Sequence, residues 1–558
     1  MDSRRVVSWR SLSVLMTAMA LVFVLGIGSY CQELDEDSCT VIAVGRLAST
    51  DGSVITSHNV DGGYDTSLLV VPAADYAPGT MVNVYKGRLR PVPQYTLMGE
   101  IPQATHTYQY FHAGYPIGNE YQVFEGEHTI GQNPKCSSSD LSDAIMYIEE
   151  LQVFGLQRGA TAREAIQVMG QLAEEYGYRD GGEVLAVSDP NEVWVFEIFP
   201  AGPQWKKASG KPGAVWCAQR VPDDHIYVSP NMSRIDRVDP MDTENFMVTT
   251  RYLETAIELG MYDPASGREF SWKDTYGYVW PKMSTGMSSR AVRLWRALTL
   301  LAPSAAGPGG YGWVFGQQPD YPFSVKPDKL VSVKDVRAVL TDMNEGTPYD
   351  NAADPVWYYQ KSDGSWVKSP LASPQASSEM QALLGLTSSA DRVVYWRPGA
   401  ILGCSYHWVS QSRNWLPNAI GGVVWYGHDN GNMSVILPVY CANRNTPPSW
   451  AFADRSKLNK DSAYWATALV DDLVNQYYQL AHPVLDSVRL PMQQEFYDNQ
   501  AAVEQVASTL YDSGKAEEAI DYLTTYSNSL MLRVEATYWE LVDRFLWLNN
   551  DRGRYPKP

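Results

Sequence analysis

The chain has 558 residues, of which 45% are apolar and 19% are charged. This balance is typical of a folded protein with a sizeable core and excludes a mainly disordered chain. The net charge of −19 would repel the phosphate backbone of nucleic acids, so we expect no nucleic-acid partner and interpret the acidity as solubility charge. The six cysteines are scattered without a CxxC pair, and neither an HExxH nor a P-loop motif occurs, so we expect no metal ion and no cofactor.

The N-terminus has the pattern of an export signal. Three arginines in the first ten residues precede an apolar run over residues 12–28 that ends in small side chains. We therefore expect residues 1–28 to be a signal peptide or membrane anchor, and the protein to be exported, either periplasmic or secreted. Contact with a membrane is expected only through this segment, if it is retained.

A β-hairpin is predicted directly after the acidic stretch that follows the signal. Strands are expected over 40–47 and 54–60, around the turn residues 49–52. Antiparallel pairing across this turn brings the start of the first strand close to the end of the second. We therefore expect Cys39 to lie near the segment from His58 to Asp61.

Later segments alternate between helical and extended patterns. Apolar residues at 141, 145, 148 and 151 share one helical face, and a second helix is expected to begin at Thr161 and to stop at Gly177. Strands are expected over 183–188 and 192–199, a helix over 288–302, and a loop boundary at 307–312. The rest of the pattern after residue 450 is helical, over 463–482, 492–513 and 517–549.

Cys39 has a chemical use if it becomes an N-terminus. Signal cleavage near residue 28 leaves a propeptide over 29–38, and a second cut between Ser38 and Cys39 gives one residue both a thiol and a free α-amine. An α-amine titrates near pH ~8, so it can take the thiol proton and return it to a leaving amine. Asp61 could orient this amine, and His58 could reach the same end of the hairpin. The alternative for Cys39 alone is a small buried side chain.

At this point the sequence resembles a known family. The run CTVIAVGRLASTDGSVITSHNVDGGYD, together with later segments such as SSRAVRLWRAL and VLTDMNEGTPYD, is similar to peptidase family C69, the PepD-type dipeptidases of the N-terminal-nucleophile hydrolase superfamily. The resemblance implies an α+β fold, a four-layer αββα sandwich over residues 39–450 with a packed helical C-terminal region over 451–558. It also implies autocatalytic removal of a propeptide and hydrolysis of dipeptides, with Cys39 matching the nucleophile and Asp61 the acidic residue that holds the amine.

Other candidate residues follow from the resemblance. Many relatives carry arginine where this chain has His58, so support for the thiolate becomes pH dependent or another residue supplies the charge. Asn119 and Thr129 are candidate substrate-binding residues. Asn231 is a candidate for orienting the amine or stabilising an oxyanion, or else a turn residue. Arg290 resembles an active-site arginine, or else is an exposed residue in the first turn of its helix.

The leading hypothesis is an exported cysteine-type dipeptidase that acts on small peptides. One alternative is an acylase of the bile salt hydrolase or penicillin acylase type, because it shares the same chemistry. The other is an inactive exported binding protein of the same fold, for which the departure at His58 is the reason. The dipeptide preference does not follow from the sequence, and a homo-oligomer is compatible with it.

Overall fold

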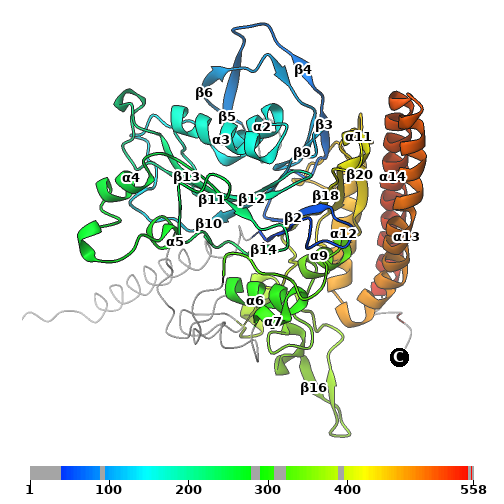
Figure 1. Ribbon diagram of the computed structural model, residues 1–558. Helices are drawn as coiled ribbons and strands as arrows, with labels where there is room; N and C mark the ends of the chain where they lie inside the picture. The colour runs from blue at the N-terminus through cyan, green and yellow to red at the C-terminus, as the bar shows by residue number, and fades with distance from the viewer. Residues whose placement is uncertain are drawn as a thin grey trace, which may run out of the picture.

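The computed structural model describes residues 39–87, 95–277, 289–306, 322–386, 395–550 and 555 (Figure 1). The predicted signal segment, the propeptide with Ser38, and the boundary at 307–312 lie outside the described residues. Within the described ranges, none of the helices combines the length and the apolar character needed to cross a bilayer.

The predicted hairpin forms the start of a six-stranded antiparallel sheet. Ala43 pairs with Thr56, and Thr40 forms a bridge with Asn59, which confirms that Cys39 lies near the end of the second strand. The order of the sheet is β14 (Ile226–Ser229), β1 (Val41–Val44), β2 (Val54–Asp61), β18 (Cys404–Ser412), β19 (Val423–His428) and β20 (Leu437–Tyr440).

A second sheet has eight strands. The predicted strands over 183–188 and 192–199 are confirmed as β11 and β12, which pair in continuous antiparallel register. The order is β15 (Phe246–Val248), β13 (Ala214–Val221), β12 (Val193–Pro200), β11 (Gly182–Ser188), β10 (Phe124–Ile130), β9 (Pro116–Asn119), β8 (Tyr110–His112) and β3 (Leu69–Val71).

The two sheets pack face to face, and helices cover their outer faces. Strands β1 and β2 contact β10 and β11, while α2 (Ile148–Arg158) and α3 (Ala162–Tyr176) cover the eight-stranded sheet. On the six-stranded side, α6 (Ser289–Leu301) contacts β14 and α9 (Val333–Leu340) contacts β2 and β18 (Figure 1). The α+β class predicted from the sequence is confirmed.

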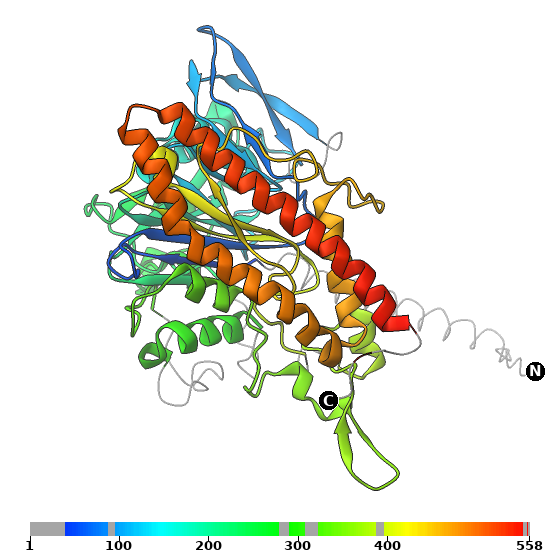
Figure 2. The ribbon, with the colours of Figure 1, turned by 90° about the vertical axis from the view of Figure 1, so that its right-hand side faces the viewer.

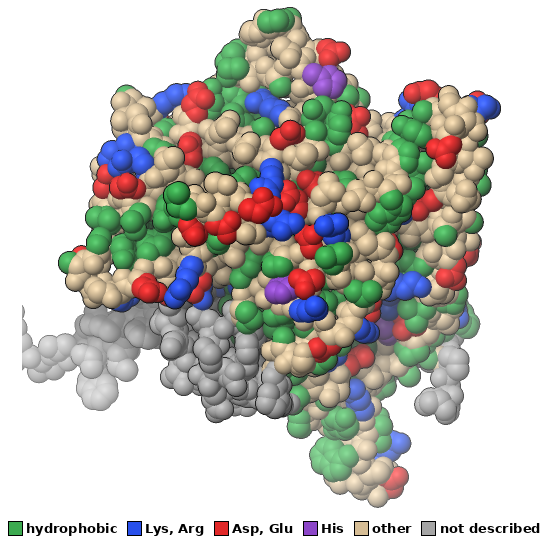
Figure 3. Space-filling view, viewed as in Figure 1, with side chains coloured by type: hydrophobic (Ala, Val, Ile, Leu, Met, Phe, Trp, Pro, Cys, Tyr) green, Lys and Arg blue, Asp and Glu red, His purple; other side chains and the backbone are tan. Residues whose placement is uncertain are grey.

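Smaller elements decorate these layers. They are the strands β4 (Ala74–Asp75), β5 (Met81–Lys86), β6 (Thr96–Pro102), β7 (His106–Thr107), β16 (Tyr358–Gln360) and β17 (Trp366–Lys368), and the short helices α4 (Tyr252–Glu258), α5 (Trp272–Thr275), α7 (Pro303–Ala306), α10 (Ser378–Leu383) and α11 (Asn418–Gly421). On the face shown in Figure 3, acidic, basic and apolar side chains are interspersed, as expected of solubility charge.

Capping residues predict the bounds of helix α3 correctly, whereas backbone pairing with a distant segment prevents the first turns of the helix predicted over 141–151. Helix α3 has Thr161 as its N-cap, which accepts a hydrogen bond from the Glu164 backbone N–H, and it ends at Gly177 as predicted. The helix predicted over 141–151 begins only at Ile148, so its first turns were predicted wrongly. The preceding backbone instead bridges from Met146 to Tyr178, and Leu141 is exposed.

The C-terminal helices lie across the six-stranded sheet. Helix α12 (Ala463–Asn475) contacts β19, and the long antiparallel pair α13 (Tyr478–Asp512) and α14 (Ala516–Asn549) contacts β20 (Figure 2). The predicted break between residues 482 and 492 is wrong, because α13 continues through two prolines. Burial of Leu485, Met492 and Phe496 on both sides of Pro491 holds the helix together, although proline removes a backbone donor.

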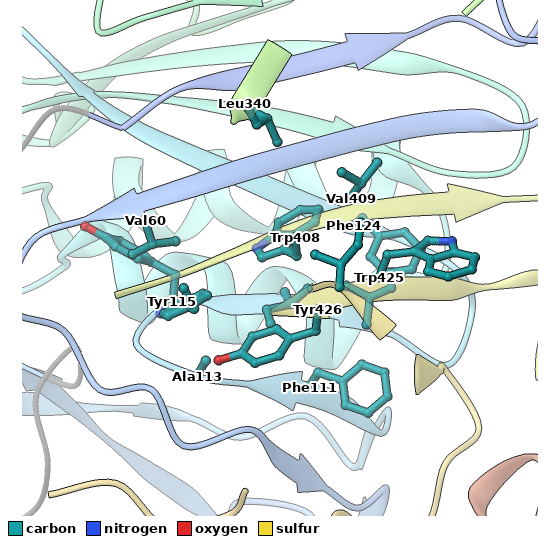
Figure 4. Close-up of a cluster of buried hydrophobic side chains, with 14 of the residues drawn as sticks. Val60, Phe111, Ala113, Tyr115, Phe124, Leu340, Trp408, Val409, Trp425 and Tyr426 are labelled. Carbon is teal, nitrogen blue, oxygen red and sulfur yellow. The ribbon is translucent and has the colours of Figure 1, made fainter. Parts of the chain in front are cut away.

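An aromatic core fills the space near the centre of the molecule. Trp408 on β18 is fully buried and lies with Phe124, Tyr115 and Tyr426 in the cluster of Figure 4. The Trp408 and Phe124 rings are 6.4 Å apart, so strands of the two sheets meet here through aromatic contacts. This rigid core forms one wall beside His58.

We expect the buried ion pair between Arg413 and Glu504 to hold α13 on the sheet. The guanidinium donates to both carboxylate oxygens, at 2.6 and 2.8 Å, and also to the Gly421 carbonyl. Substitution Arg413→Met should lower the free energy of unfolding by about 3 kcal/mol, because it removes the counter-charge of a largely buried carboxylate and leaves it only the Tyr440 and Gln500 donors. Urea unfolding followed by tryptophan fluorescence measures this loss.

The control is Arg533→Met, which removes a half-exposed pair with Glu495 on the same helix pair. An exposed pair contributes only about 0 to 1 kcal/mol. Equal losses in the two variants would contradict the role of the buried pair.

Candidate active site

Cys39 lies at the point where the described chain enters β1, and it is buried, with 3% of its surface exposed. Its sulfur atom, a ring nitrogen of His58 and a carboxylate oxygen of Glu127 all lie within 4.8 Å of one another. Burial raises the pKa of the Cys39 thiol well above its ordinary value, and the carboxylates of Glu127 and Asp61 raise it further. The thiol therefore needs a proton acceptor before it can act as a nucleophile.

Arg293 is the arginine that reaches Cys39. From the second turn of α6 it donates to the Cys39 carbonyl oxygen at 2.9 Å and to the Thr40 hydroxyl at 2.8 Å. Arg290, the arginine predicted from the sequence, is half-buried one turn earlier on the same helix. The sequence contains a signal for Arg293, because it lies three residues after Arg290 and residues three apart on a helix share one face.

Asn231 links this arginine to the other sheet. Its side-chain oxygen accepts from Arg293 at 3.1 Å, and its amide nitrogen donates to the Thr129 backbone carbonyl at 2.8 Å. The backbone of Asn231 has a φ of 62°, a conformation that asparagine tolerates better than most residues. The structure thus brings Asn231 and Thr129 to the neighbourhood of Cys39 through Arg293.

Asp61 ends β2 in a buried ion pair with Arg397. Burial raises the pKa of Asp61, and the guanidinium groups of Arg397 and Arg293 oppose this rise. Among the described residues, its Oδ1 atom has no hydrogen-bond partner although it is buried. Such an acceptor is costly unless a donor satisfies it. Arg397 was missed from the sequence, because no local pattern connects it to a residue 336 positions earlier.

His58 does not carry charge at neutral pH. It is fully buried, and this burial lowers its pKa to about 3. Its Nδ1 atom accepts from the Glu127 backbone N–H at 3.4 Å, and its Nε2 atom lies 3.9 Å from a Glu127 carboxylate oxygen. Of the two alternatives raised by the sequence, the geometry favours the second, since Arg293 and Arg397 supply positive charge beside Cys39.

A glycine allows the two sheets to approach closely at the site. A Cβ atom at Gly126 would lie 2.7 Å from the Ser57 backbone oxygen, closer than real contacts allow. The absent side chain therefore lets β10 lie directly against β2. This approach positions the Glu127 backbone N–H against His58.

The Asn119 side chain forms hydrogen bonds with the backbone of its own turn and of the end of α2. Its amide nitrogen donates to the carbonyls of Leu156 and Gly159, and its oxygen accepts from the backbone of Tyr121 and Val123. These four hydrogen bonds use the full capacity of the amide, and they favour a role in holding this turn against α2.

A cavity of about 570 Å³ is separated from His58 by two aromatic rings, those of Tyr64 and Tyr115. Tyr64 lines it, and the Tyr64 ring is 5.3 Å from Tyr115, which in turn is 5.6 Å from the His58 ring. The cavity presents charged groups of both signs. They are Lys86, Asp140, Glu149, Arg179 and Asp180.

Comparison with known proteins gives a consistent result. The family model of peptidase family C69 matches residues 38–490. The chain is 25% identical over 522 residues to the probable dipeptidase B of Lactococcus lactis subsp. lactis (strain IL1403), covering 92% of this chain and 96% of that protein. It is 24% identical to a probable dipeptidase of Salmonella dublin, over 74% of this chain and 82% of the relative. Dipeptidase A of Lactobacillus helveticus is 23% identical, over 80% of this chain and 84% of its own.

The lowered pKa of His58 predicts a measurable effect of acid on stability. Below the unfolded-state pKa of about 6.5, the unfolded chain binds a proton at His58 that the folded chain does not, so stability is lost as the pH falls toward 3. Relative to His58→Gln, the wild-type protein should lose about 1.4 kcal/mol of unfolding free energy per pH unit between pH 6 and pH 4. Urea unfolding at several pH values measures the difference, and parallel pH profiles would contradict the neutral buried imidazole.

Proposed function

The chain belongs to peptidase family C69 and is a hydrolase of peptide bonds, and from this premise we propose that it is a cysteine-type dipeptidase in which Cys39 is an autoprocessed N-terminal nucleophile. The observation that carries the proposal is the convergence on Cys39 of a buried arginine, Arg293, and the buried end of β2, where Asp61 keeps an unpartnered oxygen. The names of the relatives support the choice of dipeptides.

The fold is proposed to be the αββα sandwich of N-terminal-nucleophile hydrolases. Two stacked antiparallel sheets with helices on their outer faces support this assignment. Cys39 precedes β1 directly, in the interior of the six-stranded sheet. A nucleophile at this position is held by strands on both sides, so little reorganisation is needed during the reaction.

The proposed reaction begins with cleavage of the bond between Ser38 and Cys39. This cut converts the Cys39 amide into an α-amine that takes the thiol proton. The thiolate sulfur then attacks the carbonyl carbon of the substrate peptide bond, the ammonium returns the proton to the leaving amine, and a thioester remains. Water hydrolyses the thioester, releasing the acid and restoring the thiol. The raised pKa of the buried thiol explains why a base must lie so close.

The surrounding residues have positioning roles in this proposal. The unpartnered Oδ1 atom of Asp61 would accept a hydrogen bond from the new ammonium group. Arg293 holds the Cys39 carbonyl, and Asn231 holds Arg293. Asn231 holds Arg293 through its oxygen and Thr129 through one N–H, so we infer that it fixes the arginine, while the second N–H of the amide could donate to an oxyanion. Arg397 favours the ionised form of Asp61 and so opposes the rise in its pKa that burial causes.

The mixed charges of the neighbouring cavity fit a free dipeptide. A dipeptide at neutral pH carries an ammonium and a carboxylate, whereas an N-acylated amino acid lacks the ammonium. Asp180 and Lys86 line the same cavity, so groups of both signs are available. This argument favours a dipeptidase over an acylase. Export of the protein is proposed from the N-terminal segment alone.

The first test concerns Cys39. N-terminal sequencing of the mature protein should begin at Cys39, and Cys39→Ala should retain the propeptide and lose hydrolysis, because both steps need the sulfur. The matched control is Cys217→Ala, which removes a buried cysteine on β13 and should be processed and active. A fully active protein that still carries Ser38 would overturn the mechanism.

The second test concerns the cavity. Asp180→Asn should raise the KM for a free dipeptide about tenfold, or ~1.4 kcal/mol, with a smaller change in kcat, because it removes the charge that faces the ammonium. The substitution keeps one acceptor oxygen for the two backbone N–H groups, of Ile148 and Gly181, that the carboxylate now accepts from. The control is Asp140→Asn, whose carboxylate lines the same cavity but is fully exposed and screened by solvent. A wild-type preference for the N-acetylated substrate would favour the acylase instead.

A further inference from the structure

Two polar side chains next to the Cys39 sulfur, those of His58 and Glu127, have no role in the proposed reaction. The Cys39 sulfur, a His58 ring nitrogen and a Glu127 carboxylate oxygen come from the start of β1, from β2 and from β10, and all three residues are buried. Around a tetrahedral Zn²⁺, neighbouring ligand atoms lie about 3.3 to 3.8 Å apart, as follows from metal–ligand distances of ~2.0 to 2.3 Å. The 3.9 Å between His58 Nε2 and Glu127 Oε2 is close to this spacing.

His58 Nε2 is the independent sign of a missing ligand. The His58 side chain is fully buried, and Nε2 has no hydrogen-bond partner among the described residues. A buried polar atom without a partner is costly and therefore uncommon. The ring cannot turn away easily, because the Tyr115 ring lies 5.6 Å from it and the Trp408 ring 6.2 Å, on the aromatic core of Figure 4.

We propose that Cys39, His58 and Glu127 bind Zn²⁺, and that the bound ion holds the enzyme in a reversibly inhibited state. Thiolate sulfur, imidazole nitrogen and carboxylate oxygen are the donor types that zinc takes in proteins. Binding releases the Cys39 proton to solvent, and His58 binds through Nε2 as the neutral tautomer with its proton on Nδ1. That tautomer replaces the long acceptor contact at 3.4 Å with the Glu127 backbone N–H by two donors that face each other, a cost that the bond from Nε2 to the metal must offset.

The inhibition of hydrolysis by Zn²⁺ rests on the proposed function, whereas the binding of Zn²⁺ to these three residues does not. Zinc withdraws electron density from the bound sulfur and occupies part of the space around it, so the thiolate attacks a substrate carbonyl much more slowly. In the mature chain, the Cys39 α-amine would be a further nitrogen donor on the same residue, so the metal would occupy both nucleophile and base. Mg²⁺ and Ca²⁺ prefer oxygen ligands and should neither bind here nor inhibit.

Cobalt provides a direct readout, because a Co²⁺–thiolate bond absorbs strongly in the near ultraviolet. Titration of the purified, chelator-treated protein with Co²⁺ should give one such band per chain, and Zn²⁺ should displace it. Both metals should block alkylation of Cys39 by iodoacetamide. The band should vanish in Cys39→Ala and persist in Cys217→Ala, which removes a buried thiol elsewhere.

Two substitutions test the other donors. His58→Gln and the isosteric Glu127→Gln should each weaken Zn²⁺ binding at least tenfold, with circular dichroism and thermal melting showing whether each variant is folded. An unchanged affinity in a folded variant overturns the assigned site. Failure of the wild type to give a cobalt–thiolate band overturns it as well, and leaves the proposed function standing if Cys39→Ala is inactive. A band with unimpaired hydrolysis at saturating Zn²⁺ overturns both the inhibition and Cys39 as nucleophile.

Discussion

The site depends on positive charge held in the interior of the protein next to Cys39. Arg293 and Arg397 are both buried, and burial lowers the pKa of the Arg293 guanidinium just as it raises the pKa of Asp61. Each group is tolerated because the others surround it. Arg397 pairs with Asp61, and Arg293 is fixed by the Cys39 carbonyl and the Asn231 side chain. The network therefore couples the position of Cys39 to the charge on Asp61.

This network explains why the fold brings together distant parts of the chain. The hairpin provides Cys39 and Asp61, α6 provides Arg293, the turn after β14 provides Asn231, and the segment before β18 provides Arg397. No two of these segments recognise each other by local pattern. They meet because β14, β1, β2 and β18 are adjacent strands of one sheet, and because α6 packs on β14 and brings Arg293 to the same place. The order of strands in the sheet thus determines which polar side chains lie next to Cys39.

The parts predicted from the sequence are those set by local physical chemistry. The turn after residue 48 fixes the hairpin, and the Thr161 cap and Gly177 fix both ends of α3, because these signals act within a few residues. The helix expected from Leu141 failed because backbone pairing with Tyr178 competed with it. The break expected near Pro491 failed because buried neighbours hold α13 against β20. Arg397 could not be found, because its partner depends on the order of strands and not on spacing along the chain.

The residue at position 58 affects the charge next to Cys39 without affecting the network of Arg293, Arg397 and Asp61. An arginine at this position would bring a third permanent charge toward Cys39, whereas the buried imidazole is neutral. A neutral residue is compatible with the site, because Arg293 and Arg397 already supply positive charge that stabilises the Cys39 thiolate. The neutral ring instead leaves a nitrogen facing Glu127 and the Cys39 sulfur, which an arginine could not offer to a metal ion. With histidine rather than arginine at this position, the site has one fixed charge fewer and one more donor for a metal ion, and the proposed sensitivity to zinc depends on that donor.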